Sequence, residues 1–127
     1  MIVSNPGSSK YFVGGIIPYA TEKKIQILNV SQKTIDEFTV VSAQVAEEMA
    51  LGCQKLFGSD ISLSTTGVAG PGKGEDGKEI GTVFYTIRVK EDVTNGKLYL
   101  PHLDRPDFSY FVSQKIIQDL VGILINK

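Results

Sequence analysis

The part of the chain best suited to chemistry is a glycine-rich stretch over residues 65–74, with the sequence TTGVAGPGKG. Four glycines and a proline between positions 67 and 74 exclude a helix or a regular strand there. Glycine lets the backbone approach a ligand closely and turn its N–H groups toward an anion. The stretch is therefore either a ligand-binding loop or a long turn between two strands, and the residue types leave both interpretations open.

A phosphate-binding P-loop, G-x-x-x-x-G-K-[S/T], is the nearest comparison. Gly67, Gly72 and Lys73 match it, but Gly74 stands where a hydroxyl should bind magnesium. A P-loop must also open a helix, whereas residues 80–87 read IGTVFYTI and are typical of a strand. The sequence therefore excludes a P-loop ATPase or GTPase.

Composition places the chain among ordinary globular domains. Its 127 residues are 42% hydrophobic and 21% charged, with a net charge of −1. We therefore expect a single domain over residues 1–127. The lack of a basic patch argues against a nucleic-acid partner. One histidine and one cysteine, Cys53, predict no metal site, and Cys53 is expected to be a buried apolar residue of a helix.

The N-terminus does not resemble a secretion signal, because residues 1–6 carry neither a charged region nor a long apolar run. No apolar run of membrane-spanning length is recognised in the sequence either. A single cysteine cannot form an internal disulfide, which fits a reducing compartment. We expect a cytoplasmic protein without a membrane partner.

Hydrophobic periodicity predicts the elements of the first half. A strand containing a glycine pair is expected over residues 11–19, followed by short helices over 22–28 and 31–38. A longer helix over 43–57 has apolar residues at helical spacing and ends at Gly58.

Three strands and a helix are expected in the second half. Strands over 61–66 and 80–89 flank the glycine-rich loop, and residues 94–96, Thr-Asn-Gly, indicate a tight turn into a third strand over 97–100. The last helix, capped by Asp107 or Ser109, should run to residue 126 with one apolar face formed by Phe108, Val112, Ile116, Leu120 and Ile123. This order indicates an α/β layered fold with a mixed β-sheet flanked by helices.

Several sequence blocks together resemble the C-terminal domain of the competence/damage-inducible protein CinA, a family also known as nicotinamide-nucleotide amidohydrolase or nicotinamide mononucleotide (NMN) deamidase. The blocks span nearly the whole chain in the family's order. They are PGSSxYFxGG at 6–15, YxxxxKxxxLxV at 19–30, VSxxVAxxMAxG at 41–52, TGVAGPG at 66–72 and GTV at 81–83.

The resemblance implies a CinA C-terminal domain-like fold and hydrolysis of the NMN carboxamide to nicotinate mononucleotide and ammonia, without a metal or organic cofactor. In the family a serine attacks the carboxamide carbon and a lysine takes its proton, which requires a lowered lysine pKa. Lys24 matches that lysine, and Tyr19 matches the tyrosine before it. The positions implied to bind the nucleotide are Ser8, Thr66, Gly67, Ala69, Gly70, Gly72 and Arg105.

The sequence departs from the family pattern in two places. The family's first strand leads into Glu-Ser-Cys-Thr-Gly-Gly, which carries the usual nucleophile, and this strand and motif are missing before Pro6. Ser109 stands where a second arginine would follow Asp104-Arg105, and serine cannot replace a bidentate guanidinium. We expect an impaired amidohydrolase or, alternatively, a catalytically inactive relative that acts as a nucleotide-binding or oligomeric structural module.

Two further expectations follow from the missing strand. A replacement nucleophile would have to be one of a few hydroxyls, each of which is equally compatible with a turn or core role: Ser8, Ser9, Ser64, Thr65 and Thr66. The neighbours of the missing strand would keep unpaired backbone groups, which a second subunit could cover. We therefore expect a homo-oligomer, with residues 11–19 or the last helix in the contact.

Overall fold

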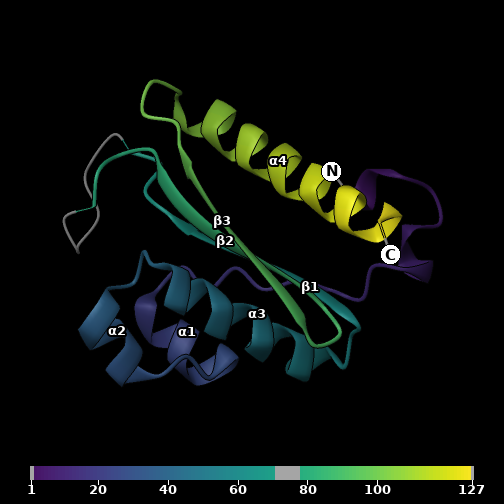
Figure 1. Ribbon diagram of the computed structural model, residues 1–127, viewed down its shortest axis with the longest axis horizontal. Helices are drawn as coiled ribbons and strands as arrows, with labels where there is room; N and C mark the ends of the chain where they lie inside the picture. Colours follow the sequence, from purple (N-terminus) through teal and green to yellow (C-terminus); the bar gives the residue numbers. More distant parts are fainter. Residues whose placement is uncertain (1, 71–77, 127) are drawn as a thin grey trace.

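The computed structural model describes residues 2–70 and 78–126, and it places a β-sheet between two helical layers. Helix α4 (Arg105–Ile125) lies on one face of the sheet (Figure 1). Helices α1 (Thr21–Leu28), α2 (Gln32–Phe38) and α3 (Ala43–Phe57) lie on the other face. Two short 3-10 helices, η1 (Ile2–Ser4) and η2 (Ser8–Lys10), precede them. This is the expected α/β layered fold.

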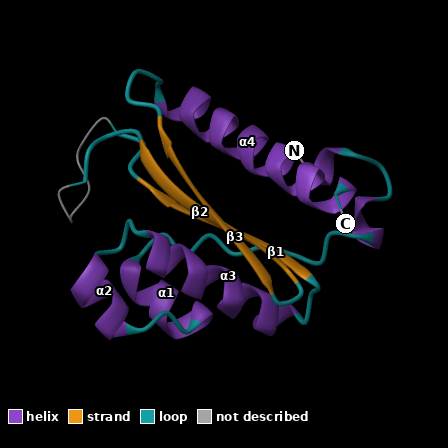
Figure 2. Ribbon diagram, in the orientation of Figure 1, coloured by secondary structure: helices purple, strands orange, loops and turns teal. Residues whose placement is uncertain are grey.

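The sheet contains three strands in chain order (Figure 2), β1 (Ile61–Gly67), β2 (Thr82–Val89) and β3 (Asp92–Tyr99). Both neighbouring pairs are antiparallel, so within the described residues the sheet is antiparallel and not mixed. The expected strands at 61–66 and 80–89 are confirmed within two residues at each end.

The main core lies between β2 and α4. Val83, Tyr85 and Ile87 of β2 pack against three α4 residues that recur every fourth position, Phe108, Val112 and Ile116. Leu120 and Ile123 extend the same contact, so the face predicted from helical spacing is confirmed. A second cluster joins α1 to α3 through Leu28, Val30, Val45 and Met49, with Cys53 partly buried beside it.

The hairpin between β2 and β3 differs from the expectation. The chain turns at Lys90 and Glu91, where Lys90 has a left-handed φ of 56°. Asn95 and Gly96 lie inside β3, opposite Thr86 and Tyr85 of β2. A Cβ atom at position 96 would lie 2.1 Å from the Tyr85 ring, so this glycine makes room for an aromatic side chain. The turn predicted at 94–96 was therefore wrong, although the antiparallel pairing is confirmed.

Helix α4 begins earlier than predicted. Asp104 is its N-cap and accepts a hydrogen bond from the backbone N–H of Asp107, so neither Asp107 nor Ser109 is the cap. Among the described helices, α4 alone is long and apolar enough to cross a membrane, which corrects the expectation that no segment reaches that length. The apolar face that packs on β2 is what a core helix of a globular domain presents.

Residues 11–19 form an extended segment without strand pairing. Its side chains nevertheless alternate: Tyr11, Val13, Gly15, Ile17 and Tyr19 are exposed, while the residues between them are wholly or partly buried. Ile16 packs on the cluster between α1 and α3, and Gly14 lies against the Phe57 ring. The predicted strand therefore has the side-chain geometry of a strand but lacks a neighbour, which explains why the described sheet is not mixed.

Candidate functional site

Lys24 is the predicted site residue with the strongest chemical character. It lies in the first turn of α1, where its Nζ donates a 2.9 Å hydrogen bond to the carbonyl oxygen of Pro18. Pro18 is buried, and Lys24 is itself partly buried. Burial lowers the pKa of the Lys24 ammonium, because the charged form loses hydration. A lysine in this state can act as a base more readily than an ordinary surface lysine.

Tyr19 directly follows the carbonyl that Lys24 contacts. Its backbone N–H donates to the carbonyl oxygen of Ile17 at 3.0 Å, which forms a tight turn before α1. Its side chain is 83% exposed. The phenol is thus available to a ligand that reaches the start of α1.

The described part of the glycine-rich loop has structural roles at each predicted position. The Thr66 hydroxyl donates to the carbonyl oxygen of Val40 at 3.0 Å. A Cβ atom at Gly67 would lie 2.9 Å from the Thr82 carbonyl oxygen, and Gly70 adopts a φ of 86° that favours glycine. Ala69 packs against the main core. Gly72 lies outside the described residues. The contacts of Thr66, Gly67, Ala69 and Gly70 are those of a turn between strands, and none of them requires a ligand.

The predicted binding residues do not all lie together. The N-terminal η2 helix, which contains Ser8, is at the same end of the long axis as the C-terminal end of α4 (Figure 1). The described residues of the glycine-rich loop are at the opposite end, together with the start of α4, where Arg105 is exposed. Arg105 and Lys24 belong to elements on opposite faces of the sheet. Ser8 is therefore separated from the loop, and the sheet separates Arg105 from Lys24.

Three hydroxyls of β1 connect the sheet to α3 and its preceding loop. Ser62 donates to the carbonyl oxygen of Ala50 at 2.7 Å, and Ser64 donates to that of Ala46 at 2.5 Å. Thr66 continues the row toward Val40. Two residues along a strand span about 6.8 Å, and four residues along a helix span about 6.0 Å. The spacing of the β1 hydroxyls therefore matches the spacing of the α3 carbonyl oxygens that accept from them. Ser64 and Thr66 are therefore buried structural donors.

The remaining candidate nucleophiles make no described hydrogen bond with the Lys24 Nζ either. Thr65 is exposed on β1, and Ser9 is exposed in η2. Within the described parts of the chain, the hydrogen bond of the Lys24 Nζ goes to Pro18 and not to a hydroxyl. The described residues thus supply a base without a hydroxyl nucleophile in contact with it.

Sequence reasoning missed a polar cluster on the other face of the sheet. The Tyr85 hydroxyl donates to Asp119, which also forms a 3.0 Å ion pair with Lys115. Burial and then the hydrogen bond and negative charge of Asp119 raise the pKa of Tyr85 to about 12. Burial would raise the pKa of Asp119, but the bonds from Tyr85 and Lys115 outweigh it and the pKa falls. The i,i+4 spacing of Lys115 and Asp119 was the available sequence signal.

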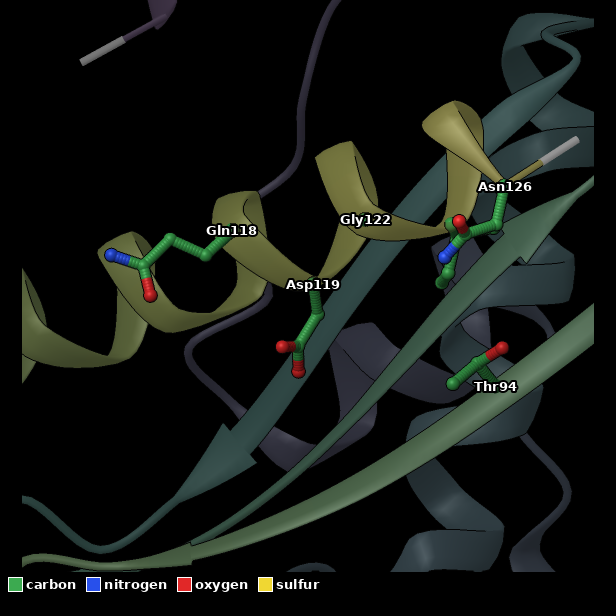
Figure 3. Close-up of a pocket in the computed structure, with 6 residues that line it drawn as sticks. Thr94, Gln118, Asp119, Gly122 and Asn126 are labelled. Atoms are coloured by element: carbon green, nitrogen blue, oxygen red, sulfur yellow. The ribbon is translucent and has the colours of Figure 1, made fainter.

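A hollow of about 520 Å³ lies beside this cluster, between β3 and the C-terminal half of α4. Figure 3 shows Asp119 directed from α4 toward the strands, with Thr94 on the strand side, Gln118 on α4 and Asn126 directly after the helix. No residue predicted from the sequence to bind a nucleotide lines this hollow. It is therefore separate from the site around Lys24.

Comparisons with known proteins agree on one family. The profile of the CinA C-terminal domain matches residues 1–121. A CinA-like protein of Flavobacterium psychrophilum is 50% identical over 96 residues, covering 76% of this chain and 23% of its own length. A CinA-like protein of Shewanella amazonensis is 38% identical over 125 residues, covering 98% of this chain and 29% of its own length. This chain thus spans about a quarter of those relatives.

Solved structures show the same fold. The competence or damage-inducible protein of Enterobacter asburiae matches with a TM-score of 0.93 at 26% identity, over 97% of this chain and 77% of that chain. A CinA superfamily protein of Enterobacter cloacae matches with a TM-score of 0.92 at 27% identity, over 97% of this chain and 72% of that chain. The elements described above are therefore arranged as in these proteins.

Proposed function

The chain belongs to the CinA C-terminal domain family, and we propose that it hydrolyses the carboxamide of nicotinamide mononucleotide, the activity implied by the sequence resemblance. The products would be nicotinate mononucleotide and ammonia, and the proposed location is the cytoplasm. The observation that carries the proposal is Lys24, whose amine has a pKa lowered by burial and is held by the Pro18 carbonyl.

Lys24 acts as the proton carrier in the proposed reaction. Its neutral amine accepts a proton from an attacking water while the water oxygen bonds to the carboxamide carbon. The same proton then passes to the leaving nitrogen, which departs as ammonia. The hydrogen bond to Pro18 leaves the Nζ lone pair free in the neutral form, since the amine donates in that bond. Tyr19 is available to contact the nucleotide at this point of the chain.

The described residues limit the rate that this arrangement can reach. No hydroxyl is within hydrogen-bonding distance of the Lys24 Nζ in residues 2–70 and 78–126. Loss of a nucleophile in a comparable catalytic unit costs about 10⁶ in rate. We therefore propose slow hydrolysis, with water as the nucleophile.

The engaged hydroxyls of β1 favour a second candidate function. The Ser64 and Thr66 hydroxyls donate to carbonyl oxygens, so the described residues include a base and an exposed tyrosine but no hydroxyl bonded to that base. A domain of this kind would bind a pyridine nucleotide without turning it over. The two candidates differ only in whether bound nucleotide loses ammonia.

The deciding experiment measures ammonia release from nicotinamide mononucleotide by the purified protein and two lysine variants. Lys24→Ala removes the proposed base. Lys23→Ala is the matched control, because Lys23 is the adjacent helix residue and is exposed, with its ammonium bonded to Gln26. We expect turnover in the wild type and the control and its loss in Lys24→Ala. Turnover that survives in Lys24→Ala would contradict the assignment of the base.

Binding is measured separately by thermal unfolding with added nucleotide. A ligand present at 100 times its Kd stabilises the folded state by about 2.7 kcal/mol. Stabilisation without ammonia release would support the second candidate and refute hydrolysis. Neither stabilisation nor ammonia release from a folded protein would contradict both.

A further inference from the structure

The extended segment over residues 11–19, named here the N-terminal segment, has unused hydrogen-bonding groups. Within the described chain, the backbone N–H and C=O groups of residues 13–16 have no hydrogen-bond partner, and those of Gly14 and Ile16 lie on the same edge of the extended segment. At the ends of the segment these groups are used: the Phe12 N–H donates to Ser8, and the Pro18 carbonyl accepts from Lys24. The unpaired groups therefore form a short central edge that another strand could complete.

The exposed row of the N-terminal segment is symmetric about its centre. Tyr11 and Tyr19 are 62% and 83% exposed, and Val13 and Ile17 are 63% and 89% exposed, with Gly15 between them. Along this row of alternate residues, Gly15 is followed in either direction by a β-branched apolar residue and then by a tyrosine. Such a row is its own complement when two copies run antiparallel.

We propose that the N-terminal segments of two copies of this chain pair antiparallel about a two-fold axis at Gly15. In this register Val13 faces Ile17 of the second copy, and Tyr11 faces Tyr19. Pairs of aromatic and of β-branched residues are among those that stabilise neighbouring strands. The contact joins the two N-terminal segments. It rests on their geometry and not on the amidohydrolase proposal, although both involve the exposed Tyr19.

The backbone groups fit this register. Gly14 lies opposite Ile16 of the second copy, and such a narrow pair exchanges two hydrogen bonds, which would use the groups that have no partner. The next pair, Phe12 with Pro18 of the second copy, leaves no N–H group unpaired, because Pro18 has no N–H and the Phe12 N–H already donates to Ser8. The exposed row then occupies the wide pairs, where opposite side chains are closest.

The other contact expected from the sequence, the outer face of α4, gives no comparable match. Tyr110, Phe111 and Ile125 are exposed there. Nothing in the structure indicates what covers that face, whereas the N-terminal segment supplies both a free edge and a self-complementary row.

The register is tested by exchanging one facing pair for opposite charges. Val13→Glu and Ile17→Lys each place a lone charge opposite an apolar residue, and we expect each to weaken the dimer about tenfold or more. The double variant places a carboxylate opposite an ammonium at both symmetric positions and should restore the dimer. Val13→Thr is the matched control, since it keeps the β-branched shape without a charge. Sedimentation velocity over a concentration series gives the dissociation constants.

A crosslink tests the two-fold centre directly. Gly15 accepts a side chain, because the nearest atom to a Cβ there is 3.8 Å away. Facing residues in a wide antiparallel pair have Cα atoms about 4.5 Å apart, within the span of a disulfide. Gly15→Cys in a Cys53→Ala background should therefore form a covalent dimer on oxidation. Ser9→Cys in the same background is exposed but lies outside the pairing, and it should not.

Three results would overturn the proposal. The first is a wild-type protein that stays monomeric throughout the concentration series. The second is a dimer that persists in both single charge variants, which would place the contact elsewhere, such as on α4. The third is a double variant that remains monomeric while Gly15→Cys fails to crosslink, which would exclude this register. Circular dichroism establishes that each variant is folded before these results are interpreted.

Discussion

At the scale of single residues, hydroxyl groups connect the layers of this domain. Ser62 and Ser64 bind the sheet to α3 through helix carbonyls, while Tyr85 binds it to α4 through Asp119. Each buried hydroxyl therefore has a partner, and the loss of one partner would leave a polar group unpaired at a cost of about 1–3 kcal/mol. This arrangement explains why serines and a tyrosine occupy positions that face the interior.

Tyr85 makes the stability of the domain sensitive to alkaline pH. Its pKa is raised to about 12 from an ordinary value of 10.0, so the folded state keeps the phenol proton after the unfolded state has lost it. The stability contributed by this difference is complete below about pH 10 and is lost as the pH rises toward about 12.

The prediction is checked by urea unfolding of the wild type and Tyr85→Phe at several pH values. We expect the unfolding free energy of the wild type minus that of Tyr85→Phe to be constant up to about pH 9 and to decrease above it. The other tyrosines are common to both proteins and cancel. Parallel pH profiles for the two proteins would show that Tyr85 ionises equally easily in the folded and unfolded states.

At the scale of elements, close packing of helices depends on where glycine occurs. Gly52 of α3 lies under α1, and a Cβ there would be 1.9 Å from the Leu28 carbonyl oxygen. Gly122 of α4 has no atom within 4 Å of the same position. One helical glycine is thus required by its neighbour, while the other only weakens its helix.

Alanine substitutions at these two glycines should have opposite effects. Gly52→Ala forces α1 away from α3, and we expect a loss of about 1–3 kcal/mol. Gly122→Ala should add about 0.5–1 kcal/mol, because alanine favours the helix and meets no neighbour. Chemical denaturation of both variants measures the change. A stable Gly52→Ala protein would mean that α1 does not pack on α3 as described.

The elements also show what the sequence can and cannot predict. Helices α3 and α4 and the core face of α4 follow from apolar spacing, which reflects burial directly. The turn at Lys90 could not be recognised, because Asn95-Gly96 has stronger turn chemistry but serves the packing of Tyr85. The N-terminal segment has the composition of a strand, yet pairing depends on a neighbour that local sequence does not encode.

For the candidate site too, the sequence predicts some features and not those that depend on tertiary packing. The family pattern identifies Lys24, and its lowered pKa agrees with the role implied by the resemblance. The pattern cannot show that Thr66 donates to Val40 or that η2 and the glycine-rich loop lie at opposite ends of the domain. These facts depend on tertiary packing, which local residue types do not determine.

At the scale of the whole molecule, the domain combines a small net charge with solvent-exposed apolar side chains. The net charge is −1, so copies repel one another little near neutral pH. Ile17 and Tyr19 are almost fully exposed on the N-terminal segment. Association of two copies would remove this surface from water and stabilise the folded state.

Thermal stability should therefore depend on protein concentration. If unfolding is coupled to dissociation, the melting temperature rises with concentration by mass action. We expect this rise in the wild type and a flat profile in Val13→Glu, measured by calorimetry over about a hundredfold range. A wild-type melting temperature that is independent of concentration would contradict the coupling.

The order of the strands has a consequence for how the chain folds. From α3 through β1 and β2 to β3, each element packs beside the one that follows it in the sequence. Two of the connections are short: residues 58–60 join α3 to β1, and residues 90–91 join β2 to β3. Short closures cost little chain entropy, so this unit can reach its native contacts rapidly. The N-terminal segment, in contrast, must meet Phe57 from more than forty residues away along the chain. The search for the native state is therefore mostly local, and its slow part is the return of the first residues to the edge of a domain that is already assembled.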